Sequence, residues 1–161
     1  MLKQGDALPD VTLKQMTADG PADVSIEDYT RGRKVVIFAL PGAFTPTCSE
    51  NHLPGYVERA AALRDKGVAA VACVSTADFF VMEAWGKSRD VGTSVDMLSD
   101  GNHTFTRSVD MAIDLSAHGL GERSNRYAMI VDDGVVSWIG VESNPGEAVA
   151  STAEAVLKQL G

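Results

Sequence analysis

The alternation of short apolar runs with helical segments constrains the fold of this chain more than any other feature. KVVIFAL at residues 34–40 and VAAVACVS at residues 68–75 are brief and rich in β-branched residues, which is typical of strands buried inside a sheet. Between them, apolar side chains from residues 53 to 63 follow a helical spacing, and Gly67 is placed to end that helix. The pattern predicts a strand, a helix and a second strand, joined as a β-α-β unit.

The rest of the chain extends this unit in both directions. The sequence DDG at residues 132–134 separates two apolar runs and predicts a β-hairpin over residues 127–141. The order predicts an α/β protein with a thioredoxin-like fold, in which helices flank a central mixed sheet and residues 1–161 form a single domain. The other expected elements are a strand at 11–16, a helix at 76–90 capped by Thr76 or Asp78, a short strand and turn at 95–102, a short helix at 103–111 and an amphipathic helix at 144–161.

Composition narrows the classes of function. The formal net charge of −8 argues against nucleic acid or an anionic membrane as a partner, and no apolar run is long enough to span a bilayer. Two cysteines are too few for a disulfide framework or a structural zinc site, so we expect no metal and no cofactor. The first ten residues lack the apolar stretch of a secretory signal, and we expect a cytoplasmic protein.

One of the two cysteines occupies a place suited to chemistry. Cys48 follows the strand at 34–40 and begins the next helix, and α/β sheets bind ligands at the carboxyl ends of their strands. Free N–H groups and the helix dipole at such a position favour the nucleophilic thiolate. Thr45 stands where dithiol enzymes with a C-x-x-C motif carry their first cysteine, so a dithiol shuttle cannot operate within this motif. A single thiol beside a hydroxyl suits attack on the O–O bond of a peroxide.

The segment PGAFTPTCSENHLPGY at residues 41–56 resembles the active-site segment of peroxiredoxins. Their pattern P-x-x-x-T-x-x-C is filled by Pro41, Thr45 and Cys48, and HLPGY is similar to the type II, or peroxiredoxin-five-like, subfamily. The resemblance covers most of the chain, because DFFVMEAWGKS, LSDGNHTFTRSVDMAIDL and ERSNRYAMIVDDGVVSWIGVE are also similar to type II members. It implies a thiol-dependent peroxidase that reduces hydrogen peroxide and alkyl hydroperoxides in antioxidant defence.

The resemblance also implies roles for individual residues. Cys48 would attack the peroxide and become a sulfenic acid, Thr45 would hydrogen-bond the peroxide, and Pro41 would shield the thiolate from water. The distant arginine of the family matches Arg126, which would stabilise the thiolate and the polarised O–O bond, with Arg123 as the fallback. The implied partners are a hydroperoxide, glutaredoxin with glutathione or thioredoxin as reductant, and a second copy in a homodimer.

The role of Cys73 stays open at the level of sequence. It lies in the apolar run at 68–75, so it is either an inert core thiol or the resolving cysteine that some plant type II members have at this place. In other members a cysteine near the C-terminal helix is the resolving cysteine, but the matching segment of this chain has none. An internal disulfide would require the helix of Cys48 to unwind, and Pro54 within that helix would remove one hydrogen bond and kink it.

Further alternatives concern the class of protein and the neighbours of the thiol. A thioredoxin-type disulfide exchange enzyme and a redox sensor that signals through Cys48 both remain open. His52, four residues after Cys48, either tunes the thiol or makes structural hydrogen bonds. Phe44 and either Phe79 or Phe80 are expected to line the peroxide entry, to form a dimer contact or to pack in the core.

Overall fold

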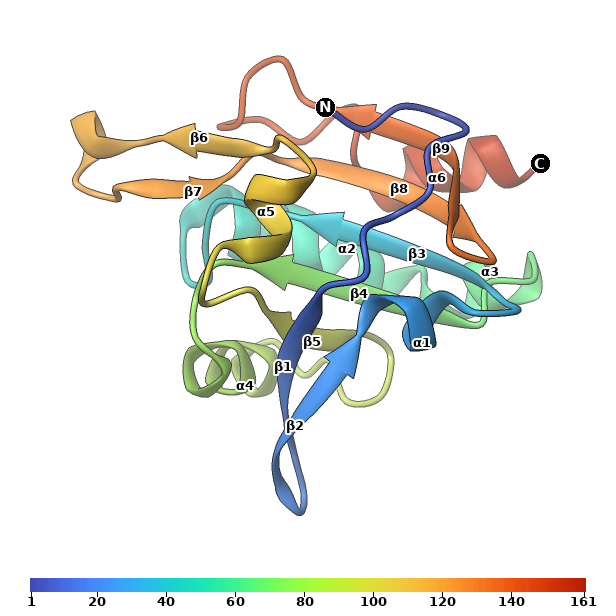
Figure 1. Ribbon diagram of the computed structural model, residues 1–161, viewed down its shortest axis with the longest axis horizontal. Helices are drawn as coiled ribbons and strands as arrows, with labels where there is room; N and C mark the ends of the chain where they lie inside the picture. Colours follow the sequence, from blue (N-terminus) through green and yellow to red (C-terminus); the bar gives the residue numbers. More distant parts are fainter.

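The computed structural model describes residues 1–161, and its centre is a seven-stranded sheet in the order β2-β1-β5-β4-β3-β8-β9 (Figure 1). Strands β3, β4 and β5 pair in parallel and all other pairs are antiparallel, so the sheet is mixed and the predicted thioredoxin-like fold class is confirmed. The strands are β1 (Thr12–Thr17), β2 (Gly20–Ser25), β3 (Lys34–Ala39), β4 (Ala70–Ser75), β5 (Asp96–Ser99), β8 (Tyr127–Asp132) and β9 (Val135–Val141), with β6 (Ala112–Asp114) and β7 (Glu122–Ser124) in a separate two-stranded hairpin.

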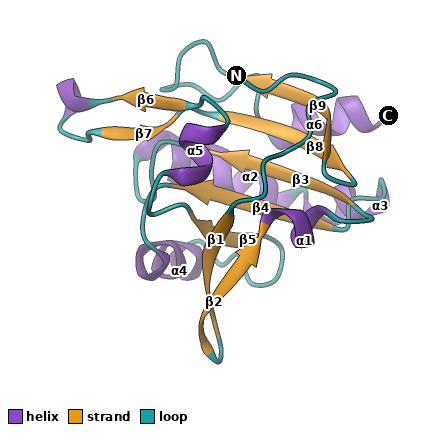
Figure 2. Cartoon of the chain, viewed as in Figure 1, coloured by secondary structure: helices purple, strands orange, loops and turns teal.

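Helices cover both faces of the sheet, with α1 and α5 in front and α2 and α6 behind in Figure 2. Side chains along β3 alternate between two apolar cores, because Val36 and Phe38 belong to one cluster and Val35 and Ile37 to the other. No helix is both long and apolar enough to cross a membrane. The helical segments are α1 (Ile26–Thr30), the π-helical turn η1 (Cys48–His52), α2 (Leu53–Glu58), α3 (Ala60–Asp65), α4 (Phe79–Ser88), α5 (Thr104–Ser108), the short η2 (Ser116–His118) and α6 (Ala153–Leu160).

The helix that carries Cys48 differs from the expected continuous helix. It opens with the wide turn η1, in which the N–H of Leu53 bonds to the carbonyl of Cys48, and it breaks at Arg59 between α2 and α3. Pro54 follows this turn at the start of α2, and a proline lacks the N–H that a regular helical turn would use. A π-helical turn accommodates one extra residue, which is a frequent device at functional sites.

The end of the chain contains a second difference. The expected helix at 144–161 is only α6, which begins after Thr152, whose side chain accepts a hydrogen bond from the N–H of Ala155. Residues 142–151, which we call the strap, instead run in turns from the end of β9 to α6. Glu142 binds the strap's own backbone and so replaces helical hydrogen bonds there. Strands β2, β6 and β7 and helix α1 were not expected, because these segments are short and weakly apolar and tertiary pairing decides their structure.

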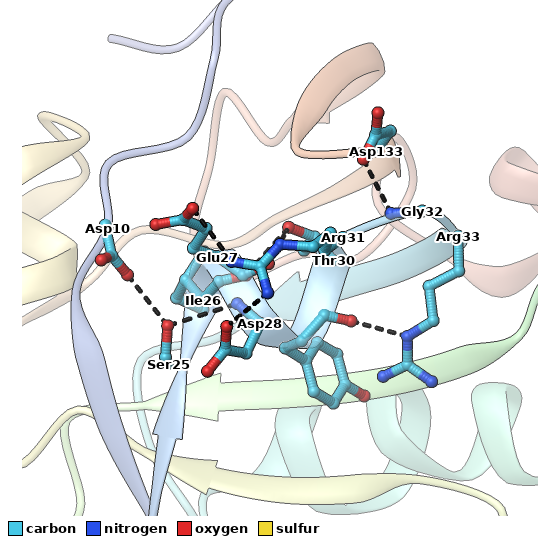
Figure 3. A network of polar contacts seen from close by, with 11 residues as sticks. Asp10, Ser25, Ile26, Glu27, Asp28, Thr30, Arg31, Gly32, Arg33 and Asp133 are labelled. Atoms are coloured by element: carbon cyan, nitrogen blue, oxygen red, sulfur yellow. Dashed lines mark hydrogen bonds and ion pairs between the residues drawn. The ribbon is translucent and has the colours of Figure 1, made fainter.

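A polar network fixes the entry to β3 (Figure 3). The Ser25 hydroxyl accepts the N–H of Asp28 to cap α1, and the N–H of Gly32 donates to Asp133 at 2.7 Å. Asp133 and Gly134 both have positive φ, of 47° and 80°, which confirms the hairpin expected at DDG. The network therefore joins the amino end of β3 to the β8–β9 turn, whereas Cys48 follows the carboxyl end of the same strand.

Two glycine-to-alanine changes give opposite predictions for stability. A Cβ on Gly140 would clash with the carbonyl oxygen of Ala150 in the strap, so we expect Gly140→Ala to lower the free energy of unfolding by about 1–3 kcal/mol. Gly55 lies in α2 with open space around it, so Gly55→Ala should raise that free energy by about 0.5–1 kcal/mol. Urea unfolding of the two reduced variants measures both values, and a stabilised Gly140→Ala protein would contradict the close contact.

Candidate active site

The loop after β3 presents Cys48 at the edge of the sheet. Pro41 is buried, the Thr45 hydroxyl donates to the carbonyl of Gly42 at 2.7 Å, and the N–H of Ser49 donates to the carbonyl of Thr45 at 2.9 Å. Cys48 therefore begins η1 with its side chain turned into the apolar core, and none of its surface is exposed. Pro41, Thr45 and Cys48 thus all belong to the segment that leads from β3 into η1.

Arg126 provides the positive charge at the thiol. Residue Tyr127 of β8 pairs with Ala39 of β3, and this register brings the residue before β8 beside the loop that follows β3. The guanidinium is buried, with 2% of the residue exposed, and its NH2 group lies 3.1 Å from the Cys48 sulfur. None of the ion pairs in the structure involves Arg126, so its charge faces the sulfur without a competing carboxylate.

Two further contacts fix the orientation of the guanidinium. The Nε–H of Arg126 donates to the carbonyl of Pro145 at 3.0 Å, and its NH1 group donates to Nδ1 of His52 at 2.9 Å. The planar guanidinium is thus held by a carbonyl, an imidazole and a sulfur, a fixed geometry that a flexible lysine would not reproduce. Arg123, the fallback, donates to the carbonyls of Leu120 and Pro41 and makes no hydrogen bond to the Cys48 sulfur.

His52 acts as a hydrogen-bonding residue beside the thiol. The residue is 1% exposed, and its Nε2 lies 2.9 Å from the carbonyl oxygen of Ser151. Since a carbonyl only accepts, Nε2 carries the proton and Nδ1 accepts from Arg126. Burial, followed by the nearby charge of Arg126, lowers the pKa of His52 to about 3. The ring is therefore neutral near neutral pH, which fits the structural alternative for this residue.

Other side chains fix the Cys48 helix against the sheet. The Tyr56 ring stacks on Phe38 of β3 at a centroid distance of 3.9 Å, and its hydroxyl donates to the carbonyl of Ser151 at 2.7 Å. The indole N–H of Trp85 in α4 donates to the hydroxyl of Ser49 at 2.9 Å. Sequence reasoning did not assign these contacts, although Tyr56 lies in the HLPGY motif and Trp85 in the expected helix.

Cys73 lies in the middle of the sheet. In β4 it pairs with Phe38 of β3 and Met97 of β5, and it is fully buried in the same apolar cluster as Cys48. Both cysteines are free thiols. Burial, and then the proximity of Cys48, raise the pKa of Cys73 well above its ordinary value. A thiol with a raised pKa in a central strand is a poor nucleophile.

Two phenylalanines expose more than half of their surface, Phe44 in the active-site loop and Phe80 at the start of α4. Phe44 is 57% exposed and has a φ of 62°, an uncommon backbone conformation for an aromatic residue. Phe80 at the start of α4 is 63% exposed, and its ring lies 4.5 Å from that of Phe79. The structure therefore places Phe44 and Phe80 at the surface and not in the core.

Known proteins resemble this chain over nearly its whole length, and residues 3–157 match the Redoxin family. Peroxiredoxin-2E-2, chloroplastic, from Oryza sativa subsp. japonica is 51% identical over an alignment of 161 positions, which covers 97% of this chain and 71% of that protein. Peroxiredoxin-2B from Arabidopsis thaliana is 41% identical over 157 residues, covering 97% and 96% of the two chains. The crystal structure of reduced Prx3 from Vibrio vulnificus in complex with hydrogen peroxide has a TM-score of 0.95 and 45% identity and covers 100% of both chains.

The buried His52 predicts a pH dependence of stability. Between about pH 6.5 and about pH 3 the unfolded chain binds a proton at His52 that the folded chain excludes, so the free energy of unfolding should fall as the pH decreases through this window. His52→Gln removes this titration, and we expect a shallower decline. Urea unfolding at a series of pH values measures the slope, with His118→Gln at an exposed position as the control. An unchanged slope in His52→Gln would refute the assignment.

Proposed function

The chain belongs to the peroxiredoxin family as a type II member, and we propose that Cys48 is the peroxidatic cysteine with which it reduces hydrogen peroxide and small alkyl hydroperoxides. Peroxiredoxins are thiol-dependent peroxidases with an antioxidant role. The observation that carries the assignment of Cys48 is the contact of 3.1 Å between its sulfur and the buried guanidinium of Arg126. A cation in a water-excluded site stabilises a thiolate strongly.

The proposed reaction moves negative charge from sulfur to oxygen. The Cys48 thiolate attacks one peroxide oxygen, the O–O bond breaks, and the products are a sulfenic acid at Cys48 and a hydroxide or alkoxide that takes a proton to leave as water or alcohol. Arg126 stabilises charge at both ends of this transfer. The proton of the Thr45 hydroxyl is bound to the carbonyl of Gly42, so the Thr45 oxygen accepts the hydrogen bond of the incoming peroxide O–H.

Shielding of the thiol is the role proposed for Pro41. Cys48 has no exposed surface, and Pro41 is buried at the start of the loop that leads to it. Exclusion of bulk water strengthens the interaction between the sulfur and Arg126 and slows side reactions of the sulfenic acid. The small peroxide reaches the sulfur when the loop of residues 42–47 moves.

An external thiol is the proposed reductant of the sulfenic acid. Cys73 is held by β-pairing on both sides and is fully buried, which favours an inert core thiol over a resolving cysteine. Glutathione would displace water from the sulfenic acid to form a mixed disulfide, and a second thiol, supplied by glutaredoxin or thioredoxin, would release the reduced Cys48. The wide turn η1 and Pro54 favour the local opening that exposes Cys48 to this partner.

We propose that the protein functions as a homodimer and is located in the cytoplasm. Phe44 in the active-site loop and Phe80 at the start of α4 expose apolar surface, and a second copy of the chain would cover it. Two free cysteines suit a reducing compartment such as the cytoplasm, although Peroxiredoxin-2E-2 is named as chloroplastic. The net charge of −8 supports the absence of nucleic acid and membrane from its partners.

Substitution of each cysteine tests the assignment. Cys48→Ser should abolish peroxide turnover, because the alcohol has neither the acidity nor the nucleophilicity of the thiol. Cys73→Ser, the matched control, should keep most of the turnover that glutathione with glutaredoxin supports, because Cys73 is only a core residue in this scheme. The coupled consumption of NADPH measures both rates. Full activity of Cys48→Ser would overturn the assignment, and total loss in a folded Cys73→Ser protein would make Cys73 the resolving cysteine.

Intact mass after one equivalent of peroxide tests how the sulfenic acid is resolved. In the absence of added thiol, we expect the reduced protein to gain one oxygen atom, since Cys73 is sealed in the sheet. Loss of two hydrogen atoms would instead indicate an internal disulfide and would contradict resolution by an external thiol. Cys73→Ser, which cannot form that disulfide, provides the reference spectrum for the sulfenic acid.

A further inference from the structure

Glu142 is a buried acid that the proposed reaction does not use. It follows β9, is 6% exposed and takes part in none of the ion pairs. Its Oε2 accepts the N–H of Val149 at 2.9 Å, the N–H of Ser151 at 2.7 Å and the hydroxyl of Ser151 at 2.5 Å. Burial raises the pKa of Glu142, but these hydrogen bonds from the strap outweigh burial and hold the pKa below its ordinary value. Glu142 is thus a carboxylate that binds its own strap.

The residue that Glu142 holds is the acceptor for two side chains of the Cys48 helix. Ser151 is fully buried, and its carbonyl oxygen accepts from Nε2 of His52 at 2.9 Å and from the Tyr56 hydroxyl at 2.7 Å. Glu142 binds both the N–H and the hydroxyl of Ser151, so it fixes the residue whose carbonyl faces η1 and α2. A rotation of this carbonyl would leave the His52 ring without its acceptor.

The ring of His52 links the Ser151 carbonyl to the guanidinium of Arg126. Because the Ser151 carbonyl requires a proton on Nε2, Nδ1 is left as an acceptor, and the NH1 group of Arg126 donates to it at 2.9 Å. The opposite tautomer would oppose N–H to N–H and would repel Arg126. The strap also supplies the Pro145 carbonyl that accepts Nε–H of Arg126 at 3.0 Å. The contacts of Arg126 with Pro145 and His52, which fix the guanidinium beside the sulfur, therefore both depend on the strap.

We propose that Glu142 is a positioning residue for the peroxidase reaction, which fixes Ser151 so that His52 holds the Arg126 guanidinium against the Cys48 sulfur. Glu142 binds Ser151, and the carbonyl of Ser151 binds His52. His52 in turn accepts from Arg126, whose NH2 group contacts the Cys48 sulfur. Glu142 itself touches neither substrate nor thiol. The proposal rests on Cys48 being the reacting thiol.

The backbone of Glu142 allows a clean test of its side chain. Its N–H donates to the carbonyl of Arg126 at 3.0 Å, and a glutamine at this position keeps that bond, the shape and one carbonyl oxygen. Glu142→Gln removes the charge that orders the strap. Rapid mixing of the reduced full-length protein with hydrogen peroxide should then show oxidation of Cys48 about tenfold slower than in the wild type. Glu147→Gln, which removes the same charge at an exposed strap position, should react at the wild-type rate.

The tautomer of the His52 ring is a second measurement, which would not change if Glu142 only stabilised the fold. We expect the ¹⁵N spectrum of the wild-type ring to show the Nε2–H tautomer alone, and Glu142→Gln to shift toward a mixture of tautomers. A folded Glu142→Gln protein with a wild-type oxidation rate and a wild-type His52 tautomer would overturn the proposal, even if it were thermally less stable.

Ser151→Ala tests the same contact if the Glu142→Gln protein does not fold. Ser151→Ala removes only the hydroxyl bond to Glu142, and we expect oxidation of Cys48 to slow by about threefold, as expected for a partial loss of one hydrogen bond. An unchanged rate in Ser151→Ala would contradict the role of the carboxylate. A wild-type protein whose Cys48 does not react rapidly with peroxide would contradict the proposed function itself, which separates the two failures.

Discussion

The buried contact between the Arg126 guanidinium and the Cys48 sulfur is the interaction on which the rest of the site depends. A cation in an apolar interior loses its hydration, and this loss must be offset by hydrogen bonds from fixed groups. Here the offset comes from the Pro145 carbonyl, the His52 ring and the sulfur, and not from a carboxylate. An acid at that place would neutralise the guanidinium, whereas the present arrangement leaves its charge available to the sulfur in the proposed reaction.

The fold makes this contact possible by bringing two distant segments together. Antiparallel pairing of β3 with β8 sets Arg126 beside the loop that leaves β3, 78 positions along the chain from Cys48. The strap then closes the site from a third segment, through the carbonyls of Pro145 and Ser151. Since these carbonyls belong to turns, their positions depend on local hydrogen bonds such as those of Glu142 and not on a regular ladder.

Much of the fold could be predicted because its strongest elements carry strong local signals. The buried strands β3 and β4, the cap of α4 at Asp78 and the DDG hairpin agree with their patterns. The unexpected β2, α1, β6 and β7 are short and rich in polar residues, so their own sequences favour no regular structure strongly. Most of the strap was expected to belong to the C-terminal helix. Its backbone N–H groups at Val149 and Ser151 instead donate to the Glu142 carboxylate.

The sequence by itself determined the chemistry: a single thiol at a strand-to-helix junction, the threonine and proline that flank it, and an arginine before a later strand. Each of these features consists of residue types at a given spacing, which can be recognised in the sequence alone. Only the tertiary structure decided that Arg126 and not Arg123 reaches the sulfur, that His52 is a neutral acceptor and that Cys73 is sealed in the sheet. Such facts depend on strand register and on burial, which arise only when segments far apart in the chain pack together.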